Sequence, residues 1–98
     1  MAAAKRKRGR LLIVDDEVEL KNALCETLAD EGYETVGATS GAEGLRTLDK
    51  QDVDLLLCDL MMPGMDGIQV LRKALEIDPT LVGIVMRGKE RSRAPSKR

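Results

Sequence analysis

Three carboxylates follow two short apolar runs, and their type and spacing suit them to chemistry. The run 11–14 (LLIV) ends at Asp15 and Asp16, and the run 53–58 (VDLLLC) ends at Asp59. Short apolar runs without a helical period predict buried strands. If these strands are parallel, their carboxyl ends share the crevice in which open α/β sheets bind ligands. Three carboxylates crowded there repel one another unless a cation joins them, and Mg²⁺ prefers such oxygen ligands.

The segment after the acid pair predicts a first helix. Leu20, Leu24 and Leu28 recur at helical spacing, and Gly32 is a natural residue for the end of such a helix. The acids at 15–17 are expected to cap its start, because negative charge is favoured at a helix N-terminus.

The middle of the chain predicts an edge strand and a second helix. Residues 33–38 alternate as in a half-buried edge strand. Ser40 and Glu43 match the capping-box pattern, which opens a short helix through Leu45 and Leu48.

The last third predicts a loop, a third helix and a fourth strand. Residues 61–65 form the loop, and the methionines there are expected to pack within it rather than bind a metal. Asp66 is expected to cap a helix that Asp78 and Pro79 end. Its inward face is expected to carry Ile68, Leu71 and Leu75, with Val70 and Ala74 on the flank. Residues 81–86 read as a buried strand.

The alternation of strands and helices predicts the fold class α/β, a doubly wound parallel sheet with helices on both faces. We expect a basic disordered arm at 1–10, a folded body at 11–86 and a basic disordered tail at 87–98. The formal charges of these three segments are +5, −11 and +5. The tails lack interleaved aromatic residues and a helix-turn-helix pattern, so sequence-specific DNA binding is unsupported.

Composition excludes several other classes of protein. Cys25 and Cys58 do not form a metal-binding spacing, and two cysteines without a secretion signal indicate reduced thiols in a cytoplasmic protein. Cys58 is expected to be a core thiol on the opposite face from Asp59. No apolar stretch approaches the roughly 18 residues of a membrane span.

The motifs resemble the receiver domain of bacterial two-component response regulators. The residues that carry the resemblance are LIVDD (12–16), SGAEGL (40–45), LLLCDLMMPGMDG (55–67) and IVM (84–86). The resemblance implies a flavodoxin-like fold and a phosphorelay function. Asp59 would be the phosphoryl acceptor and thus a carboxylate nucleophile. Mg²⁺ would be held by Asp15, Asp16, Asp59 and the backbone carbonyl of Met61.

The chain departs from the family after the fourth strand. The family places a Ser or Thr there, whereas this chain has Arg87. The family also has a fourth helix, a fifth strand ending in Lys and a fifth helix, and nothing in the sequence predicts these; Lys89 and Lys97 follow no buried strand. The fold is therefore expected to be incomplete, with an exposed fourth-strand edge prone to self-association. The abrupt change of composition after Met86 is also what a frame change or a truncated gene would produce.

Two functions from different classes fit this pattern. The first is a phosphoacceptor, not an enzyme, whose partner is a sensor histidine kinase or a phosphotransfer protein. Asn22 and Cys25 on the first helix are possible kinase contacts. The second is a receiver-derived interaction module that docks a partner without productive phosphorylation. An Asp-dependent phosphohydrolase is disfavoured, because Met61 stands where such enzymes usually carry a second Asp.

Overall fold

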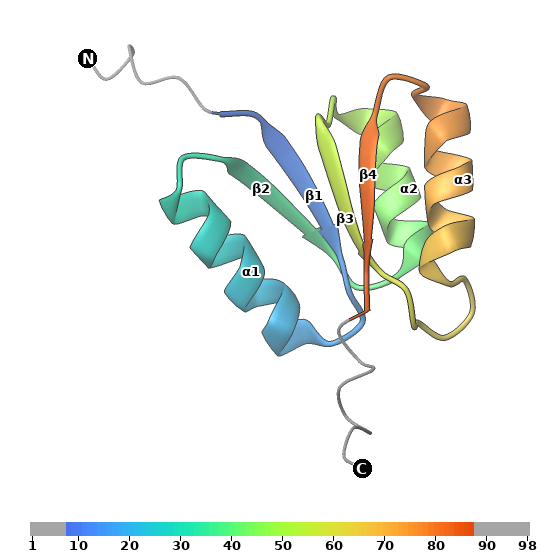
Figure 1. The fold of residues 1–98 in the computed structure, drawn as a ribbon, viewed down its shortest axis with the longest axis horizontal. Helices are drawn as coiled ribbons and strands as arrows, with labels where there is room; N and C mark the ends of the chain where they lie inside the picture. Colours follow the sequence, from blue (N-terminus) through green and yellow to red (C-terminus); the bar gives the residue numbers. More distant parts are fainter. Residues whose placement is uncertain (1–7, 88–98) are drawn as a thin grey trace.

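The computed structural model describes residues 8–87, so residues 1–7 of the predicted arm (1–10) and residues 88–98 of the predicted tail (87–98) lie outside them. The chain alternates strands and helices in the order the sequence predicts (Figure 1). The elements are β1 (Arg10–Val14), α1 (Val18–Asp30), β2 (Glu34–Ala38), α2 (Gly41–Lys50), β3 (Leu55–Asp59), α3 (Gly67–Ile77) and β4 (Val82–Met86). Among these elements, no helix is long and apolar enough to cross a membrane.

The four strands form one parallel sheet in the order β2-β1-β3-β4. This is the order of a flavodoxin-like doubly wound sheet through its fourth strand. In such sheets the ligand crevice opens where the connections change direction, between β1 and β3. Leu12, Ile13 and Val14 of β1 are fully buried, as a central strand requires. The prediction of an edge strand at 33–38 is confirmed, because within residues 8–87 the strand β2 pairs with β1 alone.

Two glycines show that the helices cover opposite faces of the sheet. A Cβ on Gly37 of β2 would meet Lys21 and Cys25 of α1, whereas a Cβ on Gly44 of α2 would meet Val14 of β1. Gly37 is paired with Ile13, and Ile13 and Val14 point to opposite faces because they are consecutive in a strand. Hence α1 lies on one face, and α2 with α3 lies on the other (Figure 1).

The core lies between the sheet and the α2–α3 layer and is entirely aliphatic apart from one thiol. Its buried members are Leu12, Val14, Ala38, Leu48, Val53, Leu56, Cys58, Val70, Ala74 and Leu81. Burying a Leu, Val or Ile side chain contributes roughly 1.5–3 kcal/mol each. This layer therefore supplies most of the stability that holds the ends of β1 and β3 side by side.

The prediction of which residues of α3 face the core was wrong. Val70 and Ala74, expected on the flank, are the buried apolar residues of the helix. Leu71 packs against the core from its side, and Ile68 and Leu75 are exposed. The helix is rotated because α2 packs beside it, and Val70 closes against Gly41 at the start of α2.

The prediction that β4 is buried was also wrong. None of its residues is buried, and Val82 and Ile84 are 58% and 47% exposed. They are paired with Leu55 and Leu57 on the α1 face, but α1 covers only the β1–β2 half of that face. Within residues 8–87, the β3–β4 half of this face is left partly open and apolar.

The two ends of α1 are capped in different ways. Its N-cap is Glu17, whose side chain makes no capping hydrogen bond, so the expectation that the Glu17 side chain caps this helix was wrong. Its end follows the prediction: Gly32 has φ +102°, and the Tyr33 N–H donates to Leu28 O at 3.2 Å. No residue of α1 is fully buried, because it packs over one edge of the sheet.

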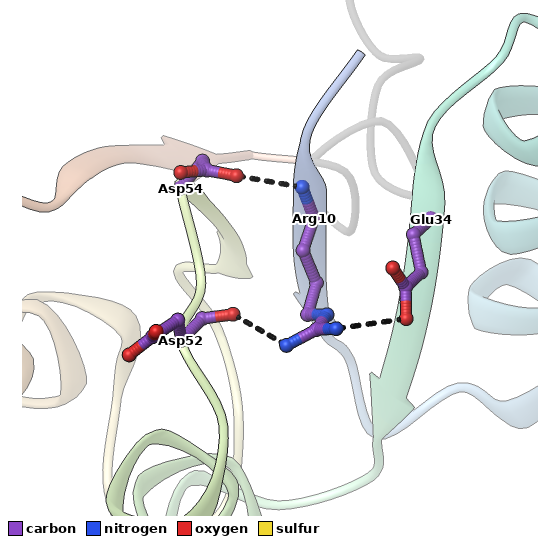
Figure 2. Close-up of polar contacts among 4 residues, drawn as sticks. All are labelled: Arg10, Glu34, Asp52 and Asp54. Atoms are coloured by element: carbon purple, nitrogen blue, oxygen red, sulfur yellow. Dashed lines mark hydrogen bonds and ion pairs between the residues drawn. The ribbon is translucent and has the colours of Figure 1, made fainter. Parts of the chain in front are cut away.

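Arg10 joins three strands at the end of the sheet opposite the acids (Figure 2). Its guanidinium donates to Glu34 of β2 and to the carbonyl of Asp52 before β3, each at 3.0 Å, while its backbone N–H donates to Asp54 at 2.8 Å. Arg10 therefore belongs to β1 and not to the arm expected at 1–10. Folded structure begins earlier still, because the Arg8 N–H donates to Gly32 O.

Candidate metal centre

The three carboxylates singled out in the sequence lie together at the carboxyl ends of β1 and β3. One oxygen from each of Asp15, Asp16 and Asp59 lies within 4.8 Å of the others. Asp15 and Asp59 are 1% exposed, and Asp16 is half-buried. Buried carboxylates this close are costly unless charge or hydrogen bonds compensate them. The three carboxylates therefore form an acidic cluster, and its most accessible member is Asp16.

Asp15 is held in place by the backbone around it. Its N–H donates to Ala38 O at 3.0 Å, which extends the β1–β2 ladder by one residue. Its Oδ1 accepts from the N–H of Glu17 at 2.9 Å. This bond forms a turn two residues before the helix cap, so the Asp15 carboxylate is directed to the crevice and not to the start of α1.

Asp59 is oriented by the loop that follows it. Its Oδ1 accepts from the Met61 N–H at 3.2 Å. The next residue, Leu60, donates its N–H to Met86 O at 2.7 Å, so β3 and β4 remain joined just past Asp59. A side chain held in this way loses little conformational freedom when a ligand arrives.

Gly67 ends the 55–67 motif but was given no role of its own from the sequence, and it lies directly against Asp59. A Cβ at this position would lie 2.6 Å from Asp59 O and 2.9 Å from Leu60 Cα, which are both backbone atoms. Only glycine allows the first turn of α3 to approach the backbone of Asp59 and Leu60 this closely. One sequence signal could have pointed to this close contact: a glycine, which is a poor helix former, stands directly after the capping residue Asp66.

Asp66 has the structural role expected of it. Its side chain accepts from the Gln69 N–H at 2.9 Å, and the Gln69 side chain accepts from the Asp66 N–H at 3.0 Å. This reciprocal capping box fixes the start of α3. It therefore also fixes the end of the loop that follows Asp59.

The methionines of the β3–α3 loop differ in environment. Met62 and Met65 pack against the core, as expected, whereas the Met61 side chain is 56% exposed. Met61 borders an open pocket of about 520 Å³ beside the acids. The pocket is lined by Asp16, Leu60, Met61, Met62, Pro63 and Asp66.

Cys58 is the buried core thiol that the sequence predicts. It is fully buried on the α2–α3 side, one residue before Asp59. Burial, together with the smaller effect of the charges of Asp59, Asp15 and Asp66, raises its pKa to about 12. The thiol is thus kept protonated at neutral pH.

The donor set fits a hard divalent cation. All three side-chain ligands are carboxylate oxygens, which suit Mg²⁺, Mn²⁺ or Ca²⁺ and not the softer metals. Arg87 directly follows β4 at the same edge of the sheet and is exposed. Lys89 and Lys97 lie outside the described residues.

Comparison with known proteins gives a consistent result. The profile of the response regulator receiver domain matches residues 11–95. The chain is 42% identical over 80 residues to the transcriptional regulatory protein GlrR of Escherichia coli, covering 82% of this chain and 18% of GlrR. It is 39% identical over 77 residues to sporulation initiation phosphotransferase F of Bacillus subtilis, covering 79% of this chain and 62% of that protein. It therefore spans less than two thirds of these relatives.

Solved structures agree with the sequence relatives. A CheY-like receiver domain protein from Methanospirillum hungatei superposes with a TM-score of 0.76 at 34% identity, over 82% of this chain and 62% of that chain. The response regulator TrrA from Thermotoga maritima, solved in complex with Mg²⁺ and BeF, superposes with a TM-score of 0.74 at 32% identity, over 87% of this chain and 76% of that chain. The chain therefore belongs to the response regulator receiver domain family of two-component systems.

Proposed function

We propose that this chain accepts a phosphoryl group on Asp59, with Mg²⁺ held by Asp15, Asp16, Asp59 and the backbone carbonyl of Met61. The observation that carries the proposal is the convergence of the three carboxylate oxygens within 4.8 Å around a buried, oriented Asp59. Asp16 is the most accessible of the three acids and is the one that meets an entering ion first.

The chemistry assigned to Asp59 is a nucleophilic displacement at phosphorus. A carboxylate oxygen forms the new P–O bond while the bond from phosphorus to the donor breaks, and the electron pair leaves with the donor. The donor is a phosphohistidine of a partner or a small acyl phosphate. Mg²⁺, when bound, supplies charge neutralisation between the carboxylate and the phosphoryl oxygens. The chain itself orients Asp59 through the Met61 N–H and holds the loop through Gly67.

The partner we propose is a sensor histidine kinase or a phosphotransfer protein in the cytoplasm. Membership of the receiver family supports this partner class. The pocket beside Asp16 and Met61 offers an apolar surface next to the acids, where a partner helix could contact the loop. A partner could also approach α1, which lies on the face of the sheet opposite α2 and α3. On this helix Asn22 is exposed and Cys25 is half-buried.

Labelling by acetyl phosphate tests the proposal. The chain is incubated with acetyl phosphate with and without Mg²⁺, and the phosphorylated fraction is measured by intact mass. We expect Mg²⁺-dependent addition of one phosphoryl group, abolished in Asp59→Asn and unchanged in Asp49→Asn. Asp49 is a matched control because it is an exposed carboxylate at the end of α2. A folded wild-type chain that is never labelled contradicts the proposal.

The exposed β4 edge favours a second candidate, a receiver-derived module that associates without switching. Val82 and Ile84 are exposed on an uncharged strand that pairs on one side only within residues 8–87. Such an edge is a template for pairing with a second copy. Multi-angle light scattering after gel filtration tests this candidate. A concentration-dependent dimer that Ile84→Lys converts to monomer supports it, and a monomer at all concentrations contradicts it.

A further inference from the structure

We propose that Arg87 binds the phosphoryl group on Asp59 and so supplies the one positive charge among the residues that directly follow the four described strands. This inference rests on the proposed function of Asp59. It assigns a role to the residue at which the sequence departs most clearly from its family.

The pairing of β3 with β4 places Arg87 beside the acids. Asp59 is in register with Met86, and the Leu60 N–H donates to Met86 O at 2.7 Å. The two strands are therefore still joined at the residue before Arg87. Neighbouring strands lie about 4.8 Å apart, so the backbone at Arg87 begins about one strand spacing from Leu60, the residue that follows Asp59. A long Arg side chain spans that distance.

The negative charge of the three carboxylates favours a cation at the carboxyl ends of the strands. Four residues directly follow the four strands, and they are Asp15, Thr39, Leu60 and Arg87. Arg87 is the only cation among them. Arg10 lies at the opposite end of the sheet, where it contacts Glu34 and Asp54. The three acids and an incoming phosphoryl group together carry a strongly negative charge, which one divalent ion does not neutralise.

The guanidinium suits this task better than other side chains. It is always protonated, and its planar fork of N–H donors matches two phosphoryl oxygens at once. Arg87 donates hydrogen bonds and keeps its protons throughout. The P–O bond to Asp59 forms, the bond to the donor breaks, and the charge that develops on the phosphoryl oxygens is stabilised by Arg87.

A different role for Arg87 predicts the opposite result. If the guanidinium serves only to neutralise the three carboxylates before Mg²⁺ binds, it competes with Mg²⁺ and slows phosphorylation. Removing it would then speed labelling and tighten Mg²⁺ binding. The sign of the effect therefore separates the two roles.

The experiment compares Arg87→Ala and Arg87→Lys with Arg72→Ala, which removes an exposed cation from α3 away from the acids. Labelling by acetyl phosphate is measured with saturating Mg²⁺. Binding of beryllofluoride, a phosphoryl mimic that forms no acyl phosphate, is measured by calorimetry. Thermal melts by circular dichroism establish that each variant is folded.

We expect Arg87→Ala to lower the labelling rate roughly 100- to 1,000-fold, as removal of a single transition-state donor does, and to weaken beryllofluoride binding about tenfold or more. Arg87→Lys should recover part of both losses, because it keeps the charge without the fork. Arg72→Ala should match the wild type. If Arg87→Ala does not fold, the loss in Arg87→Lys relative to wild type decides the question.

Two results would overturn the inference. Labelling and beryllofluoride binding that are unchanged or improved in Arg87→Ala, while Asp59→Asn abolishes both, refute the role of Arg87 and leave the proposed function standing. A folded wild-type chain that neither labels nor binds beryllofluoride with Mg²⁺ refutes both proposals.

Discussion

Adding one methyl group at Gly67 should damage the acceptor site more than adding one elsewhere. In Gly67→Ala the new Cβ would lie 2.6 Å from Asp59 O and 2.9 Å from Leu60 Cα. Carbon contacts are ordinarily about 3.5–4.0 Å, so the first turn of α3 or the end of β3 must move by roughly 0.5–1 Å. Neither side of the contact is a flexible side chain, and the shift must therefore be taken up by the backbone.

The size of the effect follows from two opposing contributions. Overpacking in a tight interior costs about 1–3 kcal/mol, while alanine in a helix recovers up to about 1 kcal/mol relative to glycine. The net loss in the free energy of unfolding is then about 1–2 kcal/mol. For a domain of this size each kcal/mol lowers the melting temperature by about 4–8 °C. We expect Gly67→Ala to melt about 5–15 °C below the wild type.

Gly83→Ala is the matched control for this prediction. A Cβ on Gly83 of β4 would meet the end of the Leu71 side chain, which can rotate away. Thermal and urea unfolding are measured for both variants, together with acetyl phosphate labelling at a temperature where both are folded. Gly67→Ala should lose stability and label more slowly, and Gly83→Ala should keep both properties nearly intact. If Gly67→Ala is as stable and as readily labelled as the wild type, the argument from close backbone approach is refuted.

Three further predictions concern capping and protonation. Asp66→Ala should lower the free energy of unfolding by about 1 kcal/mol, whereas Asp66→Ser should retain most of it; urea unfolding measures both. Cys58 should resist alkylation in the folded chain at pH 8 while Cys25 reacts, and peptide mass reads the difference. The free energy of unfolding should fall as the pH rises from 9 towards about 12, because the Cys58 thiol loses its proton at lower pH in the unfolded chain than in the folded one. The pKa of Glu43 is lowered because the Thr39 N–H donates to its carboxylate. Its contribution to the free energy of unfolding is therefore present above pH 4.5 and is lost as the pH falls through the lowered pKa. Urea unfolding between pH 3 and 6 should show a weaker dependence on pH in Glu43→Gln, and an identical dependence would contradict this assignment.

The order of the elements could be predicted because it depends on local rules. Apolar runs, the Ser40 and Asp66 caps and the glycine at position 32 each act over a few residues, and the structure follows them. At Ser40 the side chain caps as expected, although Glu43 bonds to Thr39 instead of Ser40. The three acids could be predicted to meet because parallel strands share one carboxyl edge.

The face of α3 could not be predicted by the same means. The helix has two adjacent apolar stripes, one through Val70 and Ala74 and one through Ile68 and Leu75, and periodicity does not rank them. The choice is made by the neighbours, since α2 lies on one side and Gly83 leaves room for Leu71. Burial depends on contacts that are distant in sequence.

The contacts of Arg10 are also long-range. They reach residues 42 and 44 positions away, which no local pattern indicates. A basic residue beside a run of other basic residues reads as part of a solvated arm. Only the pairing of β1 with both of its neighbours shows that Arg10 closes the amino-terminal edge of the sheet.

The parallel pairing of β1 with β3 has a consequence for the order of events during folding. Leu11 pairs with Leu55, so the acids after β1 and the acid after β3 belong to segments 44 residues apart. Such a loop must close, at an entropic cost, before any ion finds three ligands. The unfolded chain carries the same carboxylates but offers no chelate. A divalent ion that binds the three acids therefore binds the folded chain alone, and at about 1,000 times its dissociation constant it would add about 4 kcal/mol to the free energy of unfolding.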